Sequence, residues 1–491
     1  MGNLFWRYEV VLVVVVMVVL MERGAADVPT YKLAFLSPLS GAEIPDKLAI
    51  EWTSAFQVAL AVLNGETQEY QFEAVYFDTA CDYQTSTVLS LNISKQSGLI
   101  GAVGPACSGA AISAARALQQ DPIIPLVSFA ATALSLSDRG LFPNFFRTVY
   151  SDNYQASAVA ASILKFNMSK ITLLYTNDYY SSLLAEQIQV LSGSAIAKKQ
   201  LLEPGSNSSV DLKQLEGVLN LIDPNNFVLL VVQPAVAEDI WTTASNMRMT
   251  AYPWWYFGTD GTTAFDPSNV EGKITESTVA ALQGEIGLAP FEGDYSNTSI
   301  CNKFYQYWQI HGFAGLPATD PNKSRSYVPY LIDTVATFFE VVNILIHSGT
   351  EINPSTVLAT LNGTGPGPLQ FKGCTGVVQI DPSTGSRFVS ADQPAIYDLV
   401  SLTQDSWESK GRIEDGTFTT LQPLMRPGTY PAPNQEYIAP DPNTPHKKKN
   451  GALIAGITVL VASILVVAFA LFYFHQKRTK SPTSFFPMLQ Q

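Results

Sequence analysis

Residues 99–111 read LIGAVGPACSGAA, and residues 123–135 read IIPLVSFAATALS. Each of these two units is an apolar run that ends in small and hydroxyl-bearing residues, which predicts a buried strand and a turn that opens a helix. Ser108 lies at the turn of the first unit, and Thr132 lies at the turn of the second. Such turns leave backbone N–H groups, a hydroxyl and a helix N-terminus facing one crevice. The two units therefore predict a site for a small anion such as a carboxylate.

Strands and helices alternate on both sides of these units. Apolar strands are expected near 31–38, 71–78, 171–176, 227–233 and 254–258, and helices near 49–64, 84–97, 154–166, 181–191, 210–221 and 235–248. Near-continuous apolar strands between helices are typical of parallel sheets that are covered on both faces. The pattern restarts after Phe145 and holds too many strands for one compact sheet. We therefore expect an α/β fold of two lobes, each built on a doubly wound parallel sheet.

The order of segments along the chain follows from this pattern and from the composition of the two ends. We expect a signal peptide at 1–26, the first part of lobe 1 at 27–150, the first part of lobe 2 at 151–262, a return to lobe 1 at 263–375, a return to lobe 2 with a closing hairpin at 376–421, a proline-rich stalk at 422–450, a transmembrane helix at 451–474 and a cytoplasmic tail at 475–491.

The two ends carry apolar runs of different length. Residues 10–21 form a 12-residue apolar run behind Arg7, and small residues follow as far as Ala26, which predicts a cleaved secretory signal; an uncleaved anchor is the alternative. Residues 451–474 hold no charge over 24 positions, which is enough for one tilted membrane span. A signal peptide places the N-terminus outside. We therefore expect a type I single-pass protein of the plasma membrane, with an extracellular ectodomain and a 17-residue tail at 475–491.

Cysteines and glycan acceptor sites agree with a secreted ectodomain. Four cysteines predict two disulfides with three alternative pairings, of which the local one joins Cys81 to Cys107 and Cys301 to Cys374. Six acceptor sites for N-glycans lie between the signal and the span: Asn92, Asn167, Asn207, Asn297, Asn322 and Asn362.

Open α/β sheets bind ligands beyond the carboxyl ends of their strands. The loops at these ends supply the candidate binding residues Ser108, Gly109, Ala130, Thr132, Asp152, Tyr179 and Asp260, with Ala131, Asp178 and Tyr180 beside them. The first lobe contributes hydroxyls and helix starts, and the second lobe contributes carboxylates and a tyrosine pair. An α-amino acid needs this division, because its carboxylate seeks an anion site and its ammonium seeks an anionic partner.

Each candidate residue also has a structural alternative. Ser108 and Thr132 are favoured helix N-cap residues, and Asp152 suits the N-cap of the helix expected near Tyr154. Asp260 lies in the turn sequence Gly-Thr-Asp-Gly, and tyrosines often serve only in packing. Their convergence on strand ends that face one cleft favours the binding role.

Six segments resemble the successive signatures of the type I periplasmic-binding-protein, or Venus-flytrap, receptor ectodomain. They are GPACSGA (104–110), SFAATALSLS (128–137), FPNFFRT (142–148), SDNYQA (151–156), TNDYYSS (176–182) and YFGTDGT (256–262). The resemblance covers about residues 30–420 and is shared with metabotropic glutamate, GABA-B and natriuretic peptide receptors. It implies that Ser108 and Thr132 contact a ligand carboxylate, and that Asp152, Tyr179 and Asp260 contact its ammonium. It also implies the Cys81–Cys107 disulfide and dimerisation, as a homo- or heterodimer, through the ectodomain.

Several function classes are disfavoured. The net charge of -13 argues against a nucleic-acid partner. No nucleophile–base pair or phosphate-binding loop marks an enzyme, and the four scattered histidines predict no metal site, so we expect no cofactor. We expect a single-pass cell-surface receptor whose ectodomain closes around a small amino-acid-like ligand. The alternatives are a peptide-binding clearance receptor or co-receptor, and a fragment of a larger class C type receptor.

Overall fold

The structure is a computed structural model of the chain. It describes residues 28–40, 44, 46–205, 209–224, 226–250, 254–264, 274–293, 300–314, 327–403 and 406–424. The expected signal peptide, most of the stalk, the transmembrane helix and the tail lie outside these residues.

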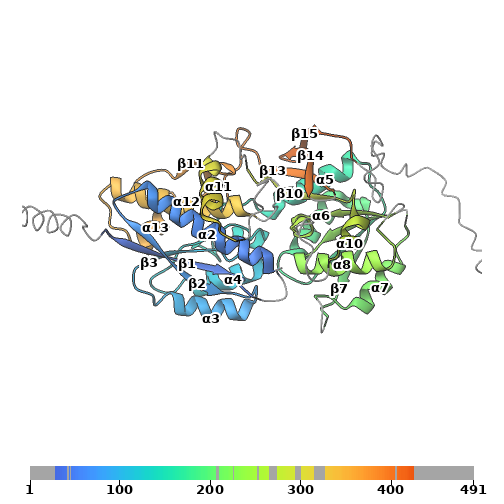
Figure 1. Ribbon diagram of the computed structural model, residues 1–491, viewed down its shortest axis with the longest axis horizontal. Coiled ribbons are helices and arrows are strands. Elements are labelled where there is room, and N and C mark those ends of the chain that lie inside the picture. The colour runs from blue at the N-terminus through green and yellow to red at the C-terminus, as the bar shows by residue number, and fades with distance from the viewer. Residues whose placement is uncertain are drawn as a thin grey trace, which may run out of the picture. The chain divides into compact units, whose positions relative to one another are not determined.

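The first lobe is built on a five-stranded parallel sheet, shown in blue and cyan in Figure 1. Its order is β2-β1-β3-β4-β5, with β1 at Thr30–Ser37, β2 at Gln71–Asp78, β3 at Leu99–Val103, β4 at Leu126–Ser128 and β5 at Phe145–Arg147. The chain moves from β1 to β2 on one side and then returns to β3 on the other. Such a reversal opens a crevice beyond the carboxyl ends of β1 and β3, where ligands of doubly wound sheets bind.

Helices cover both faces of this sheet because successive residues of its strands alternate between two cores. Leu33 and Phe35 of β1 pack into the larger core, and Ala34 and Leu36 pack into the other. The larger core holds α2 (Asp46–Glu66), α11 (Ile300–His311), α12 (Val328–His347) and α13 (Pro354–Leu361), and the opposite face holds α3 (Tyr83–Ile93) and α4 (Ser108–Ala117). The yellow and orange helices α11 to α13 thus return to the lobe that the blue elements begin (Figure 1).

The second lobe is built on an eight-stranded mixed sheet of order β15-β14-β13-β10-β9-β8-β6-β7. Five strands are parallel: β6 (Ile171–Thr176), β7 (Ile196–Leu202), β8 (Phe227–Val231), β9 (Trp255–Gly258) and β10 (Ile286–Pro290). Three antiparallel strands complete it: β13 (Ile396–Leu402), β14 (Trp407–Glu414) and β15 (Thr417–Leu421). The chain adds β7 on one side of β6 and β8 on the other. This reversal of strand order places a second crevice between β6 and β8.

One expected lobe boundary is too early. Residues 263–375 are expected to belong to lobe 1, but β10 at Ile286–Pro290 pairs with β9 and β13 in the second sheet. The chain returns to lobe 1 only after β10. This strand is short and apolar, and its partner β13 lies more than a hundred residues later in the chain. No local pattern in the sequence reveals that pairing.

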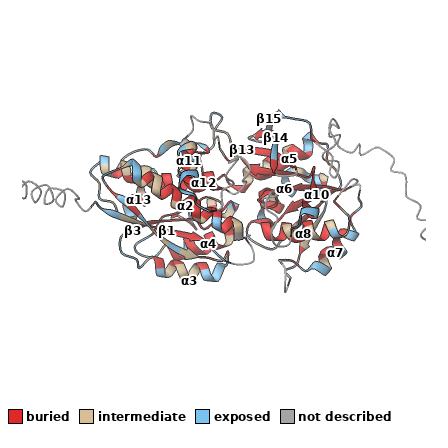
Figure 2. Cartoon of the chain, in the orientation of Figure 1, coloured by how far each residue is buried: buried red, intermediate tan, exposed pale blue. Residues whose placement is uncertain are grey.

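Helices also cover both faces of the second sheet. One face packs against α5 (Asp152–Lys165) and α6 (Ser181–Ser192), and the other packs against α7 (Leu212–Asn220), α8 (Pro234–Asn246) and α10 (Glu276–Leu282). The outer helices α3 and α7 carry pale-blue exposed residues, whereas the sheet strands are mostly red (Figure 2). The sequence does not predict the edge strand β7. Its middle residues include Lys198 and Lys199 and are exposed or only partly buried, so it lacks the continuous apolar run of the central strands.

Within the described residues, α12 has the length and composition that a membrane span requires. However, 72% of its most apolar 18-residue stretch is buried in the protein, and its side chains fill the core of lobe 1. It is therefore a core helix of the lobe.

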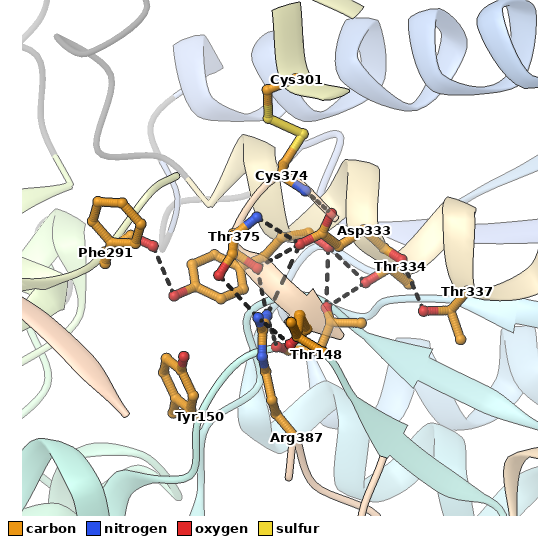
Figure 3. A network of polar contacts seen from close by, with 12 residues as sticks. Thr148, Tyr150, Phe291, Cys301, Asp333, Thr334, Thr337, Cys374, Thr375 and Arg387 are labelled. Atoms are coloured by element: carbon orange, nitrogen blue, oxygen red, sulfur yellow. Dashed lines mark hydrogen bonds and ion pairs between the residues drawn. A yellow bond between two sulfur atoms is a disulfide. The ribbon is translucent and has the colours of Figure 1, made fainter. Parts of the chain in front are cut away.

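A buried polar network joins the segments that pass between the lobes, as Figure 3 shows. The guanidinium of Arg387 lies 3.9 Å from the carboxylate of Asp333 on α12, and both side chains are almost fully buried. Arg387 also donates hydrogen bonds to the carbonyl of Thr148 at 3.2 Å and to that of Thr375 at 2.9 Å. Over its described residues the chain passes between the lobes three times, after β5, after β10 and before β13, and Arg387 joins the first of these crossings to the third.

The second crossing, after β10, joins the same network through α12. The Tyr330 hydroxyl donates to the carbonyl of Phe291 at 2.9 Å, and the Thr148 hydroxyl donates to the carbonyl of Tyr330 at 3.0 Å (Figure 3). Asp333 accepts from the backbone N–H groups of Cys374 and Thr375 at 2.5 and 3.0 Å. One helix therefore holds all three crossings.

Candidate functional site

A pocket lies where the two crevices meet; its space of about 520 Å³ includes a part that is open to solvent. The first lobe lines it with Ile44, Leu48, Trp52, Ala106, Cys107, Ser108, Ala130, Thr132 and Tyr327, and the second lobe lines it with Tyr180, Gln233, Pro234, Asp260, Gly261 and Ala264. Ser108 and Asp260, which the sequence assigns to opposite ends of a ligand, thus face the same space.

The N-terminus of α4 forms one wall of the pocket. Cys107 is the N-cap residue and Ser108 is the first helical residue, so Ser108 is not a side-chain cap. Its Oγ accepts a hydrogen bond from the N–H of Ala133 at 3.2 Å. The Ser108 hydroxyl proton therefore remains available to a ligand, beside the first-turn N–H groups that have no partner within a helix.

The second unit forms a loop in place of the helix that the sequence predicts. After β4 the chain makes only the short 3₁₀ turn Leu134–Ser137. The Ser128 hydroxyl accepts from the N–H groups of Ala130 and Ala131 at 3.3 and 3.0 Å, so these amides serve the loop itself. The buried guanidinium of Arg147 donates to carbonyls of the same loop, which fixes Thr132 at the pocket wall.

Asp260 forms the acidic wall of the pocket. It is the first residue of α9 (Asp260–Thr263), and it is buried with 6% of its surface exposed. Its two carboxylate oxygens accept hydrogen bonds from the hydroxyls of Tyr180 and Tyr327. The following Gly261 is required by close packing, because a Cβ there would lie 2.0 Å from the carbonyl oxygen of Val232.

Asp152 lies behind Asp260 and is 1% exposed. It is the first residue of α5, whose N-cap is Ser151, so it is not the cap that the structural alternative suggests. Neither carboxylate oxygen makes a hydrogen bond of ordinary geometry. Burial, and next the nearby Asp260 carboxylate, raise the pKa of Asp152 to about 8, while Thr132 and Arg147 oppose the shift. Asp152 therefore holds its proton near neutral pH, and a cation bound beside it would favour its ionised form.

Gly109 and Tyr179 lie outside the pocket lining, at its rim. Tyr179 is 47% exposed, and its ring stacks on that of Tyr83 in the first lobe with centroids 6.2 Å apart and planes at 21°. A Cβ on Gly109 would lie 3.3 Å from the Tyr179 ring. These two candidates therefore meet each other where the lobes touch, and Tyr180 takes the inner position.

Sequence reasoning missed the pocket residues contributed by α2 and by Gln233 and Tyr327. Leu48 and Trp52 follow β1, so the rule of strand ends could have indicated them, but their apolar character matched an ordinary core helix. Gln233 lies directly after β8 and was accessible by the same rule. Tyr327 comes from the return to lobe 1, far from any expected strand end, and gives no such signal.

The disulfides follow the local pairing expected from the sequence. Cys81 bonds to Cys107 and Cys301 bonds to Cys374. The first fixes the N-cap of α4 against the loop after β2. Of the six predicted glycan acceptors, Asn92 and Asn167 are exposed, Asn362 is half-buried, and Asn207, Asn297 and Asn322 lie outside the described residues.

The chain matches one family model, described as the receptor family ligand binding region, over residues 51–387. It is 23% identical over 427 residues to metabotropic glutamate receptor-like protein E of Dictyostelium discoideum, covering 83% of this chain and 47% of that protein. It is 32% identical over 134 residues to taste receptor type 1 member 1 of Homo sapiens, covering 25% of this chain and 16% of that receptor. The chain thus spans less than half the length of either relative.

Proposed function

Because the chain belongs to the family of receptor ligand-binding regions, we propose that its two lobes bind a small α-amino acid between them and close around it. The single observation that supports this most is the placement of Ser108 and Asp260, from different lobes, on one pocket. An anion site and an anionic group that face each other suit a zwitterion.

The first lobe supplies the partner for the carboxylate. The N-terminus of α4 carries partial positive charge, and its first N–H groups are unbonded within the helix. The Ser108 hydroxyl, which accepts from Ala133, is left to donate to the ligand, and Thr132 adds a second hydroxyl. Helix N-termini bind carboxylates without a neighbouring cation.

The second lobe supplies the partner for the ammonium. Asp260 already accepts from two tyrosine hydroxyls, but a carboxylate has about four acceptor positions, so it can also accept from an ammonium. Bringing in a cation also favours the ionised form of the buried Asp152, whose pKa burial and Asp260 raise.

Closure follows from the split between lobes. A ligand shifts a conformational equilibrium only through better binding to one state, and contacts from both walls exist only when the lobes are together.

In the same proposal the ectodomain is extracellular on a type I single-pass protein of the plasma membrane, with the span at 451–474. It also dimerises through this ectodomain, as the family resemblance implies.

Calorimetric titration of the purified full chain with free L-α-amino acids tests the proposal. We expect binding of at least one amino acid, and loss of it when the same compound is supplied as its amide or its N-acetyl derivative. Asp260→Asn should weaken binding tenfold or more, by the usual cost of truncating a buried charged contact. Asp392→Asn, an exposed position, is the matched control.

Two results contradict the proposal. One is failure of every free amino acid to bind while a peptide binds, which favours a peptide receptor. The other is unchanged affinity in Asp260→Asn. Ser108→Ala should also weaken binding, whereas Ser355→Ala, in the first turn of α13 of the same lobe, should not.

A further inference from the structure

Besides the N-terminus of α4 and the Asp260 carboxylate, the pocket has an apolar wall. Ile44 precedes α2, and Leu48 and Trp52 lie one turn apart on that helix, so the last two share one face. Their exposed fractions are 8%, 5% and 3%. Ala106 and Ala264 extend the same lining.

This wall is rigidly supported. The Trp52 ring packs edge-on against the ring of Phe129, with centroids 5.4 Å apart and planes at 69°. Phe129 directly follows β4 and is fully buried. The indole is thereby held beside the loop that carries Thr132, so the apolar wall adjoins the carboxylate site.

The charges of α2 do not serve the pocket. Lys47 and Glu51 lie four residues apart, with Nζ and Oε1 separated by 4.0 Å, and neither lines the pocket. Among the described lining residues there is no lysine, arginine or histidine. Asp260, the one acidic residue among the described lining residues, is committed in the proposed function to the ammonium.

We propose, on the basis of that function, that the amino acid has an uncharged apolar side chain of the size of leucine, methionine or phenylalanine, and that Leu48 and Trp52 select it. An acidic side chain placed against this wall would be desolvated without a cation, and a basic one would lack a carboxylate of its own. An apolar side chain instead gains from burial, and a pocket of this kind separates side chains by about 10- to 200-fold per methylene group.

Competition among free L-amino acids on the full chain tests this inference. We expect leucine, methionine or phenylalanine to bind at least tenfold more tightly than alanine, glutamate and lysine. Leu48→Ala should reduce leucine affinity about tenfold and leave alanine affinity nearly unchanged. Leu63→Ala is the matched control, because Leu63 is a similarly buried leucine of α2 that does not line the pocket.

The outcomes separate the two proposals. If glutamate or lysine binds more tightly than leucine, the apolar side-chain class is wrong and the amino-acid receptor remains. If no free amino acid binds, the proposed function itself fails. Equal losses for leucine and alanine in Leu48→Ala, with Leu63→Ala unaffected, would remove Leu48 as a selecting residue. The wild-type ranking decides the ligand class even if Leu48→Ala does not fold.

Discussion

The hydroxyl of Tyr327, at the start of the lobe 1 helix α12, donates a hydrogen bond to the carboxylate of Asp260, at the start of the lobe 2 helix α9. Tyr180, from the second lobe, donates to the other oxygen of the same carboxylate. Asp260 is therefore the group proposed to bind the ligand and also a direct contact between the lobes.

Removing the Tyr327 hydroxyl should destabilise this contact. A hydrogen bond to a charged group contributes about 1.5–3 kcal/mol, so Tyr327→Phe should lower the free energy of unfolding by about that amount. Denaturant unfolding, followed by tryptophan fluorescence, measures the change. Tyr175→Phe, a half-buried tyrosine outside the pocket, should change it by less than about 0.5 kcal/mol. Equal effects of the two substitutions would contradict the role of the contact.

Stability should fall as pH rises between about 4 and 8. Burial raises the pKa of Asp152 from 3.8 to about 8, so in this window the folded chain holds a proton that the unfolded chain has lost. The contribution is complete below about pH 4 and is lost as pH rises through the folded pKa, with a slope of up to about 1.4 kcal/mol per pH unit. Urea unfolding across this range measures the slope. Asp152→Asn should flatten it, and an unchanged slope would count against the assignment.

Amino-acid binding should release a proton. An ammonium bound beside Asp152 favours its ionised form, so affinity should rise with pH as the solution approaches pH 8, by at most tenfold per unit. Calorimetry in two buffers of different ionisation heat counts the protons released. In Asp152→Asn the count should fall to near zero. If Asp152→Asn released as many protons as the unaltered chain, the released proton would come from another group.

The buried ion pair between the crossings should be worth far more than an exposed pair. Arg387→Met leaves Asp333 charged and buried, which typically costs about 3–5 kcal/mol. Arg412→Met removes a guanidinium whose pair with Asp398 is partly exposed, and should cost about 1 kcal/mol or less. Thermal unfolding of both variants compares them. Similar melting temperatures would show that the crossings do not depend on Arg387.

Two glycines should respond in opposite directions to alanine. Gly261→Ala places a Cβ 2.0 Å from a backbone oxygen and should both destabilise the second lobe and weaken binding. Gly217, inside α7, has open space at its Cβ position, so Gly217→Ala should stabilise the chain by about 1 kcal/mol. Thermal unfolding measures both, and a stable, fully binding Gly261→Ala would contradict the packing described for α9.

Much of the first lobe and half of the site could be predicted because their signals are local. Apolar strands that end in Ser108 and Thr132 indicate both the sheet and the pocket wall, and Asp260 follows a third such strand. The choice between Tyr179 and Tyr180 could not be made from sequence, since adjacent residues at a helix start point in different directions. Here Asp178 accepts from the N–H of Tyr180, and this turn sets which ring enters the pocket.

The remaining differences depend on contacts between distant residues. The helix expected after Thr132 is absent because Ser128 and Arg147 bind the loop's amides and carbonyls. In sequence, Leu48 and Trp52 on α2 look like ordinary core residues. Only the position of the second lobe shows that they line a pocket. Periodicity reports burial, but it does not report which neighbour provides that burial.

The stacked rings of Tyr83 and Tyr179 form a contact between the two lobes that is separate from the Asp260 carboxylate. The two side chains belong to different lobes, so their attraction favours contact between the lobes without any ligand. If the lobes close as proposed, this stacking lowers the free energy that a ligand must supply for closure.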